Sequence, residues 1–304
     1  MNRISLPAPL REKCRGIERA LQSVDRLAVA FSGGVDSTFV AWFAREILGK
    51  TVIALFADTP FVSAKERREA SATAERLRFD LEVVAFAPLA LPEIAQNPVD
   101  RCYRCKKELF GCILARAGEL GCPVVADGTH AGDAGAYRPG QKALAELGIL
   151  SPLALAGLVK EDVRLLSRSF GLPNWNKPSQ SCLATRFPYG TKLSHELLRK
   201  VERAEDFLYG LGCFQVRVRC HGDLVRIEVA ESDFPTVLSP QNKSALLAAF
   251  GELGFSHVCL DLAGFRSGSW DGERVADGGC QTPEDRGQRG GRRGADVGYR
   301  KAEK

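Results

Sequence analysis

Short apolar runs alternate with longer segments of helical pattern from residue 27 onward. The runs at 27–31, 51–57, 81–86 and 123–126 are rich in Val, Ile and Leu and predict buried strands. Between them, helical patterns extend to about residue 48 and then over 63–78 and 102–120. Strands of this kind, each separated by a helix, indicate a parallel sheet covered on both faces. The pattern therefore predicts a doubly wound α/β domain, in which ligands bind beyond the carboxyl ends of the strands.

A different pattern begins after residue 190. A helix is predicted from Ser194 to about residue 209, with strands at 214–220, 224–229 and 257–262 and a helix near 240–250. In the first of these strands the apolar residues alternate with Arg217 and Arg219, which predicts one apolar and one polar face. We therefore expect a smaller α+β domain over residues 191–270, after a first domain over residues 1–190.

Two stretches fit neither pattern. Residues 171–192 are irregular and contain three prolines; irregular segments of this length inside a domain are usually functional or disordered. The aromatic residues Trp175, Phe187 and Tyr189 argue against disorder, so we expect a substrate loop there. Residues 271–304 are rich in Gly and Arg and have no apolar periodicity, which predicts a disordered tail. Because acidic and basic residues nearly cancel in it, a mobile tail is favoured over an RNA contact.

Composition narrows the class of protein. The chain has 304 residues and a net charge of +5, which suits anionic small molecules such as nucleotides and does not by itself argue for nucleic acid. No apolar run approaches the roughly 18 residues that span a membrane, and the N-terminus lacks the pattern of a secretory signal. We expect a soluble, cytoplasmic protein. In a reducing compartment, clustered cysteines among the ten present favour metal binding or catalysis over disulfides.

A glycine-containing turn joins the first predicted strand to its helix. The run 27–31 is followed by Ser32-Gly33-Gly34-Val35-Asp36-Ser37. The glycines let the backbone approach a phosphate, and the start of the next helix offers N–H groups and a positive dipole end. Ser32 and Ser37 add hydroxyl donors, while Asp36 is expected to hold magnesium or to cap the helix. These are also ordinary turn residues, but their combination at a strand end predicts a phosphate-binding loop.

The loop differs from a Walker motif because no lysine follows its glycines, so transfer of the γ-phosphate is not implied. SGGVDS resembles the signature of the PP-loop (ATP pyrophosphatase) family, whose fold is that of the adenine nucleotide α-hydrolases. The resemblance implies ATP and Mg²⁺, adenylation of a substrate oxygen and release of pyrophosphate. Asp58, just after the second predicted strand, is expected either to meet the nucleoside or to cap the next segment.

Three cysteines stand apart from the other seven. Cys102 and Cys105 form a Cys-Tyr-Arg-Cys motif at a predicted helix start, among arginines and lysines that favour thiolates. Cys182 lies in the segment 171–192. Three ligands are too few for structural zinc, but they suit three irons of a [4Fe–4S] cluster whose fourth iron carries an exchangeable sulfide. Three unconnected thiols are the alternative.

The assembled motifs resemble the LarE family of ATP-dependent sulfur transferases, from about residue 12 to residue 270. The resemblance rests on FSGGVDST, NPVDRCYRCKKELF, DGTH with AYRPG, LGILSPLALAGL, LSRSFGLPNWNKPSQSCLATRFPYG, VRVRCHGDLVRIEV and LDLAGFRSGS. It implies that the carboxylates of pyridinium-3,5-biscarboxylic acid mononucleotide are adenylated in turn and converted to thiocarboxylates, for the nickel-pincer nucleotide cofactor. It also implies a homo-oligomer.

The same resemblance assigns sulfur delivery to the cysteine of the PSxxC loop, here Cys182. Members without the CxxC pair give up that cysteine's own sulfur and are left with dehydroalanine. Members with two further cysteines are thought to use a cluster-bound sulfide instead. The presence of Cys102 and Cys105 therefore favours an iron–sulfur cluster held by these two residues and Cys182.

Arginines complete the expected site. Arg186, four residues after the key cysteine, is expected to steady developing charge or the Cys182 thiolate. Arg217 and Arg219 are expected to bind the substrate phosphate, because arginine pairs well with phosphate. Glu205 and Glu228 are weaker candidates for a metal or an intersubunit contact, and we expect them instead to form solvated ion pairs with neighbouring arginines.

Two other classes of protein share parts of this sequence pattern. A PP-loop tRNA thiolase can pair a CxxC motif with a distant third cysteine, but it needs a basic or aromatic surface for RNA. The region 191–270 carries no dense basic stripe, so nucleic acid is not favoured as a partner. A non-catalytic nucleotide-binding or redox-sensing module is disfavoured by an intact SGGVDS loop together with three candidate sulfur ligands.

Overall fold

The first sheet is parallel throughout. The computed structural model describes residues 6–133 and 139–266 of the chain. Four strands follow the order β3-β2-β1-β4, and they are β1 Arg26–Ala30, β2 Thr51–Asp58, β3 Asp80–Ala85 and β4 Val124–Ala126. In β1, Leu27 pairs with Val52 of β2 on one side and with Val124 of β4 on the other. The predicted parallel sheet is confirmed.

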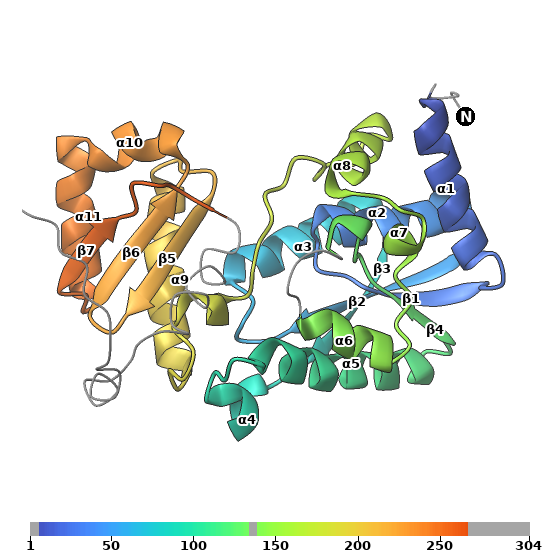
Figure 1. The fold of residues 1–304 in the computed structure, drawn as a ribbon, viewed down its shortest axis with the longest axis horizontal. Coiled ribbons are helices and arrows are strands. Elements are labelled where there is room, and N and C mark those ends of the chain that lie inside the picture. The colour runs from blue at the N-terminus through green and yellow to red at the C-terminus, as the bar shows by residue number, and fades with distance from the viewer. Residues whose placement is uncertain (1–5, 134–138, 267–304) are drawn as a thin grey trace, which may run out of the picture. The chain divides into compact units, whose positions relative to one another are not determined.

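Helices cover both faces of this sheet (Figure 1). Successive residues of a strand point to opposite faces, and β1 divides accordingly: Leu27 and Val29 lie in one apolar core, and Ala28 lies in the other. The first core includes α1 Ala8–Leu21, α2 Val35–Trp42, α3 Ala64–Leu77, α7 Pro152–Leu155 and α8 Lys160–Ser169. The second includes α5 Arg101–Glu119 and α6 Pro139–Glu146. The doubly wound α/β architecture is therefore confirmed.

The second sheet is small and mixed. Its order is β5-β6-β7, with β5 Val216–His221 antiparallel to β6 Leu224–Val229, and β6 parallel to β7 His257–Leu260. It shares an apolar core with α9 His195–Gly210 and α11 Pro240–Glu252, and the short α10 Phe234–Leu238 precedes α11. The expected α+β element set is confirmed. Phe214, predicted to begin the first strand, lies before β5 and is exposed.

The hydrophobic pattern left several short elements unassigned. These are α4 Pro92–Ala95, α6, α7 and α8, together with a π-helical turn at Phe43–Ile47 that extends α2. Ala126 at the end of β4 also forms an isolated parallel bridge with Leu150. The four-residue helices α4 and α7 carry too few periods for an apolar repeat to stand out, whereas the ten-residue α8 lies in a region where no helix was predicted. Among them α8 matters most, because it brings a charged residue to the phosphate loop.

The segment 171–192 contains only one short regular element, the 3₁₀ turn Leu183–Arg186. It is nevertheless tied to the rest of the fold by backbone hydrogen bonds: the N–H of Leu183 donates to the carbonyl of Phe61, and the N–H of Gly190 donates to that of Asn97. Phe187 is buried. An ordered loop follows, as its aromatic content predicted.

The chain up to Phe265 forms one compact unit. A domain boundary near residue 190 stays a prediction, and the tail 271–304 lies outside the described residues. Within the part of the chain that the structure describes, no helix has the length and apolar character needed to cross a membrane.

Candidate functional site

The phosphate loop lies between the end of β1 and the start of α2. Gly33 has φ +67°, and a Cβ there would come within 2.5 Å of the Ala70 Cα, so only glycine fits. The hydroxyls of Ser32 and Ser37 share a hydrogen bond of 3.2 Å. The N-cap of α2 is Gly34, and no side chain caps the helix. The first N–H groups of α2 are therefore directed at an anion site rather than at a capping side chain.

Asp36 lies in the first turn of α2 and does not cap it. One of its oxygens forms an ion pair with Lys160, the first residue of α8. Its Oδ1 atom is buried and has no hydrogen-bond partner among the described residues. A carboxylate oxygen in this state suits Mg²⁺, which proteins bind through one or two carboxylates together with phosphate oxygens. Of the two roles expected for Asp36, capping is wrong and magnesium binding fits.

Gly128, two residues after the end of β4, packs against the phosphate loop. A Cβ on Gly128 would lie 2.7 Å from the backbone N of Ser37. Its neighbour Asp127 is buried and accepts hydrogen bonds from the N–H of Thr129 at 3.2 Å and the hydroxyl of Ser151 at 2.7 Å. The DGT motif thus packs against the phosphate loop and is held in place by these hydrogen bonds.

Asp58 ends β2 and pairs with Arg67, whose Nε lies 2.6 Å from Oδ1. The next helix is capped by Ser63 instead, in a capping box with Glu66. The capping role expected as one alternative for Asp58 is therefore wrong, and the nucleoside contact stays a prediction. Asp58 and Arg67 line a cavity of about 280 Å³ that also includes His195.

The segment 171–192 begins at the phosphate loop. Asn174 is buried and donates from Nδ2 to the carbonyl of Gly33 at 3.1 Å and to the hydroxyl of Thr38 at 2.9 Å. Lys177 donates to the same carbonyl at 3.2 Å and forms an ion pair with Glu69 at 2.9 Å. Cys182 follows five positions later in the chain, so one ordered segment connects the loop to the cysteine.

Cys182 lies beside a buried arginine that the sequence did not single out. The Arg101 side chain is 2 % exposed; its Nη2 donates to the sulfur of Cys102 at 3.2 Å and to that of Cys182 at 3.8 Å. Its Nη1 donates to the Oδ1 of Asn97 at 2.8 Å. The fold thus brings Cys182 and Cys102, eighty positions apart in the chain, to one guanidinium group.

Burial opposes ionisation of these thiols. It raises the pKa of Cys105 to about 12, with a further contribution from Cys182. Burial also raises the pKa of Cys182, although the charges of Arg101 and Arg186 act in the opposite direction. Because burial alone lowers the pKa of a guanidinium, the raised pKa of Arg101 reflects the three neighbouring sulfurs. The predicted preference for thiolates thus depends on the positive charges of Arg101 and Arg186, which only partly offset the desolvation of Cys182.

The expected iron–sulfur cluster is not supported by this arrangement. Among the described residues, no group of three or more His, Cys, Asp or Glu side chains stands in position to hold a metal ion. The Arg101 guanidinium is itself bonded to two of the sulfurs. Thiolates are the ligands that such clusters use, but here the sulfurs of Cys102 and Cys182 accept hydrogen bonds from a guanidinium group.

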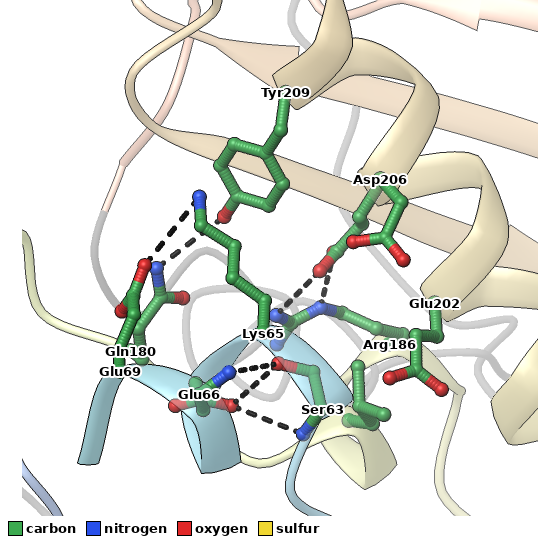
Figure 2. Close-up of a pocket in the computed structure, with 11 residues that line it drawn as sticks. Ser63, Lys65, Glu66, Glu69, Gln180, Arg186, Glu202, Asp206 and Tyr209 are labelled. Atoms are coloured by element: carbon green, nitrogen blue, oxygen red, sulfur yellow. Dashed lines mark hydrogen bonds and ion pairs between the residues drawn. The ribbon is translucent and has the colours of Figure 1, made fainter. Parts of the chain in front are cut away.

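Arg186 is almost fully buried and holds the loop around Cys182. Its Nε and Nη2 bind the two carboxylate oxygens of Glu205 at 2.6 and 3.1 Å. Its Nη1 donates to the hydroxyls of Ser181 and Thr185, both at 2.8 Å. Figure 2 shows this guanidinium at the wall of a narrow pocket between α3 and α9. The ion pair expected for Glu205 exists, but it is buried rather than solvated.

Arg217 and Arg219 are 3 % and 4 % exposed, so the predicted polar face of β5 is buried. Arg219 pairs with the fully buried Glu228 at 3.1 Å and donates to the carbonyl of Thr185 at 2.7 Å. The solvated pair expected for Glu228 is therefore wrong. The loop 171–192 covers this face of β5, which the alternation along one strand could not indicate.

Arg217 differs from Arg219 in the charges that surround it. It donates to Gln180 at 3.0 Å and to the carbonyl of Ser179 at 2.8 Å, and within the described residues it has no carboxylate at ion-pair distance. Burial and the nearby charge of Arg186 lower the pKa of its guanidinium to about 10. A buried cation without a counter-ion favours an anionic ligand.

Comparisons with known proteins agree with this geometry. The NAD synthase family model matches residues 10–97, which include the phosphate loop and Asp58. An uncharacterized protein of Synechocystis is 39% identical over 259 residues, covering 85% of this chain and 97% of its own length. The pyridinium-3,5-bisthiocarboxylic acid mononucleotide synthase of Lactiplantibacillus plantarum is 38% identical over 265 residues, covering 86% and 94%.

A third relative, an uncharacterized protein of Methanocaldococcus jannaschii, is 30% identical over 242 residues, covering 80% of this chain and 91% of its own length. These alignments are much longer than the NAD synthase match. The architecture, the SGGVDS loop and identity over most of the chain point in one direction: the chain belongs to the LarE family of the PP-loop superfamily.

Proposed function

We propose that this protein is an ATP-dependent sulfur transferase that converts the carboxylates of pyridinium-3,5-biscarboxylic acid mononucleotide to thiocarboxylates. The relative from L. plantarum bears the name of a synthase for the bisthiocarboxylic product. One observation carries the proposal: the segment 171–192 contacts the phosphate loop through Asn174 and Lys177 and then delivers Cys182 to the buried Arg101. Nucleotide activation and sulfur chemistry therefore share one segment. We place this reaction in the cytoplasm, in a homo-oligomer.

Adenylation is the first step of the proposal. A substrate carboxylate oxygen attacks the α-phosphorus of ATP, the bond to the β-phosphate oxygen breaks, and pyrophosphate leaves. The N–H groups at the start of α2 and the hydroxyls of Ser32 and Ser37 would bind the phosphates, and Asp36 would hold Mg²⁺ through Oδ1. Mg²⁺ in this position would neutralise charge on the departing pyrophosphate. The product is an acyl adenylate with AMP as its leaving group.

Sulfur transfer is the second step, and we assign it to Cys182. Its thiolate attacks the acyl carbon, the bond to the AMP oxygen breaks, and a thioester forms. The positive charges of Arg101 and Arg186 favour the thiolate against the effect of burial. If Cys182 gives up its own sulfur, loss of its α-proton breaks the Cβ–S bond and leaves a thiocarboxylate and dehydroalanine.

Substrate binding is assigned to the buried arginines next to this loop. Arg217 lacks a carboxylate partner among the described residues, whereas the charge of Arg219 is matched by Glu228. A phosphate would pair with Arg217 without first displacing a carboxylate, so we assign it the larger share of phosphate binding.

The test is pyrophosphate release from ATP–Mg, with the pyridinium biscarboxylate mononucleotide and bulk tRNA supplied separately. We expect the mononucleotide to stimulate release and tRNA to have no effect. Stimulation by tRNA alone would replace the substrate while keeping the adenylation chemistry. If neither the mononucleotide nor tRNA stimulates release of pyrophosphate, the proposal is wrong.

A cysteine variant separates the two steps. Cys182→Ala is expected to abolish thiocarboxylate formation and to keep pyrophosphate release, because the thiol acts only after adenylation. Cys112→Ala changes an exposed cysteine on α5 and is the matched control. If Cys182→Ala still forms thiocarboxylate, the assignment fails.

The sulfur source is decided on the wild-type protein. A loss of about 34 Da from Cys182 after turnover without bound iron would identify the residue's own sulfur as the source. About four irons per chain after anaerobic reconstitution, lost in Cys102→Ala and Cys105→Ala, would restore the cluster predicted from the sequence.

A further inference from the structure

The phosphate loop has no cation of its own. Residues 32–37 include two serines, two glycines, a valine and an aspartate, and no lysine or arginine. Pyrophosphate carries several negative charges as it leaves ATP, and helix N–H groups with one Mg²⁺ neutralise only part of them. Enzymes that transfer phosphoryl or nucleotidyl groups place lysine or arginine side chains on these oxygens. The cations for this loop must therefore come from elsewhere in the chain.

Two lysines reach the loop from outside it. Lys160, the first residue of α8, forms an ion pair with Asp36. Lys177 reaches the opposite part of the loop, where its Nζ lies 3.2 Å from the carbonyl oxygen of Gly33. The side chains of Lys160 and Lys177 are only 22% and 13% exposed, so both ammonium groups are confined next to the loop.

The contacts of Lys177 are not needed to hold the loop in shape. The Gly33 carbonyl already accepts a hydrogen bond from the buried Asn174, which also binds Thr38. The carboxylate partner of Lys177 is Glu69, whose side chain is 38% exposed. The Glu69 carboxylate therefore keeps contact with water and can be solvated when Lys177 leaves it. Lys177 can therefore change partner at small cost when an anion of higher charge enters.

Lys160 is placed to act together with the magnesium ligand. Its partner Asp36 presents one oxygen to the lysine and leaves the buried Oδ1 without a partner among the described residues. Asp36 would hold a metal through Oδ1, and the ammonium group of Lys160 lies at its other oxygen. Lys160 would therefore add a second positive charge beside the phosphate loop.

We propose that Lys160 and Lys177 bind the pyrophosphate of ATP and stabilise it as it leaves. This inference deepens the proposed adenylation and rests on it. A Walker loop contains its own lysine. Here the corresponding positive charges would come from Lys160 on α8 and from Lys177 on the segment that carries Cys182.

Inorganic pyrophosphate binding with Mg²⁺, measured by calorimetry without substrate, is the direct test. Lys160→Gln and Lys177→Gln remove the positive charge and keep a terminal N–H donor on a slightly shorter side chain. Each is expected to weaken pyrophosphate binding about tenfold or more, which corresponds to ~1.4 kcal/mol. AMP affinity should stay within about twofold, because AMP lacks the groups that the lysines bind.

The matched control is Lys13→Met. Lys13 pairs with Asp162 at the same end of α8 but does not contact the phosphate loop. It should leave pyrophosphate affinity unchanged. Variants in which pyrophosphate affinity equals that of the wild type, or in which AMP and pyrophosphate affinities fall together, would overturn the inference. Lys177→Arg should restore binding.

The two hypotheses fail separately. If wild-type protein binds pyrophosphate through these lysines but releases none with the mononucleotide, the proposed function is wrong and the pyrophosphate site stands. If it releases pyrophosphate and both lysine variants bind and release it as the wild type does, only the assignment of the lysines is wrong.

Discussion

Two regions of the molecule hold buried or half-buried charge in different ways. The PP-loop region, residues 32–37, is one contiguous stretch at the end of a strand. Its hydrogen-bond donors for an anion are backbone N–H groups and the hydroxyls of Ser32 and Ser37. The buried arginine region consists of Arg186, Arg217 and Arg219 with Glu205 and Glu228, from the loop, α9, β5 and β6. Local chain geometry forms the first region, whereas pairing between distant segments forms the second. Substitutions should therefore affect mainly activity in the first region, and stability in the second region wherever a buried arginine is paired with a carboxylate.

The largest effect is expected from Gly33→Ala. The new Cβ would lie 2.5 Å from the Ala70 Cα at a positive φ, so the loop must shift. A misplaced phosphate loop should lower pyrophosphate release on the order of a hundredfold. Gly49→Ala is the matched control, since Gly49 has φ +65° but nothing within 4 Å. It should cost about 1 kcal/mol of stability from backbone strain and leave release intact. Equal activity losses in both variants would show that strain alone is responsible.

The next effect is on stability. Glu228→Gln leaves the buried Arg219 without its counter-charge and should lower the free energy of unfolding by about 3 kcal/mol in urea denaturation. Glu119→Gln breaks the exposed pair with Arg116 and should change it by less than about 1 kcal/mol. A Glu228 variant as stable as the wild type would mean that Arg219 is compensated in another way.

Arg217→Met should separate binding from stability. Losing a charge-assisted contact to phosphate, about 2 kcal/mol, should raise the KM for the mononucleotide about thirtyfold. The free energy of unfolding should not fall, because burial already lowers the pKa of this unpaired guanidinium and disfavours its charge. Arg203→Met, on the exposed face of α9, should change neither quantity. A large loss of stability with an unchanged KM would assign Arg217 a purely structural role.

The smallest effect concerns pH. Burial raises the pKa of Glu66, which lines the pocket in Figure 2. Because its folded-state pKa lies above the unfolded value, its contribution to stability is present at low pH and is lost as pH rises through the folded pKa. Glu66→Gln keeps a side-chain oxygen that can accept from the N–H and hydroxyl of Ser63 but no longer ionises, so its Tm relative to wild type should rise with pH. Glu12→Gln should show the opposite slope, since hydrogen bonds from Arg19 and Arg15 lower the pKa of Glu12. Parallel slopes would contradict the assignment.

Much of the first sheet could be predicted because its strands are continuous apolar runs separated by long helices. The phosphate loop was also predictable, since all its residues are adjacent in sequence. Lys160 could not be found in this way: α8 begins 124 positions after its partner Asp36, and only the folded chain joins them. Arg101 was visible beside Cys102, but its burial between two cysteines was not.

The arginines of β5 show the limit of reading alternation along a strand. The pattern correctly separated Arg217 and Arg219 from the apolar residues of that strand, yet both arginines are buried. Period-two alternation reports which residues share a face. It does not report what covers that face, here the loop through Ser179 and Thr185.

The α/β class, the position of the phosphate loop and the family could all be predicted from the amino-acid sequence, because each depends on local periodicity or on contiguous residues. Tertiary structure alone decided the protonation environment of the cysteines, the pairing of the buried arginines and the approach of Lys160 and Lys177 to the loop. These properties depend on desolvation and on charge separations of a few ångströms, which arise only when distant segments pack together.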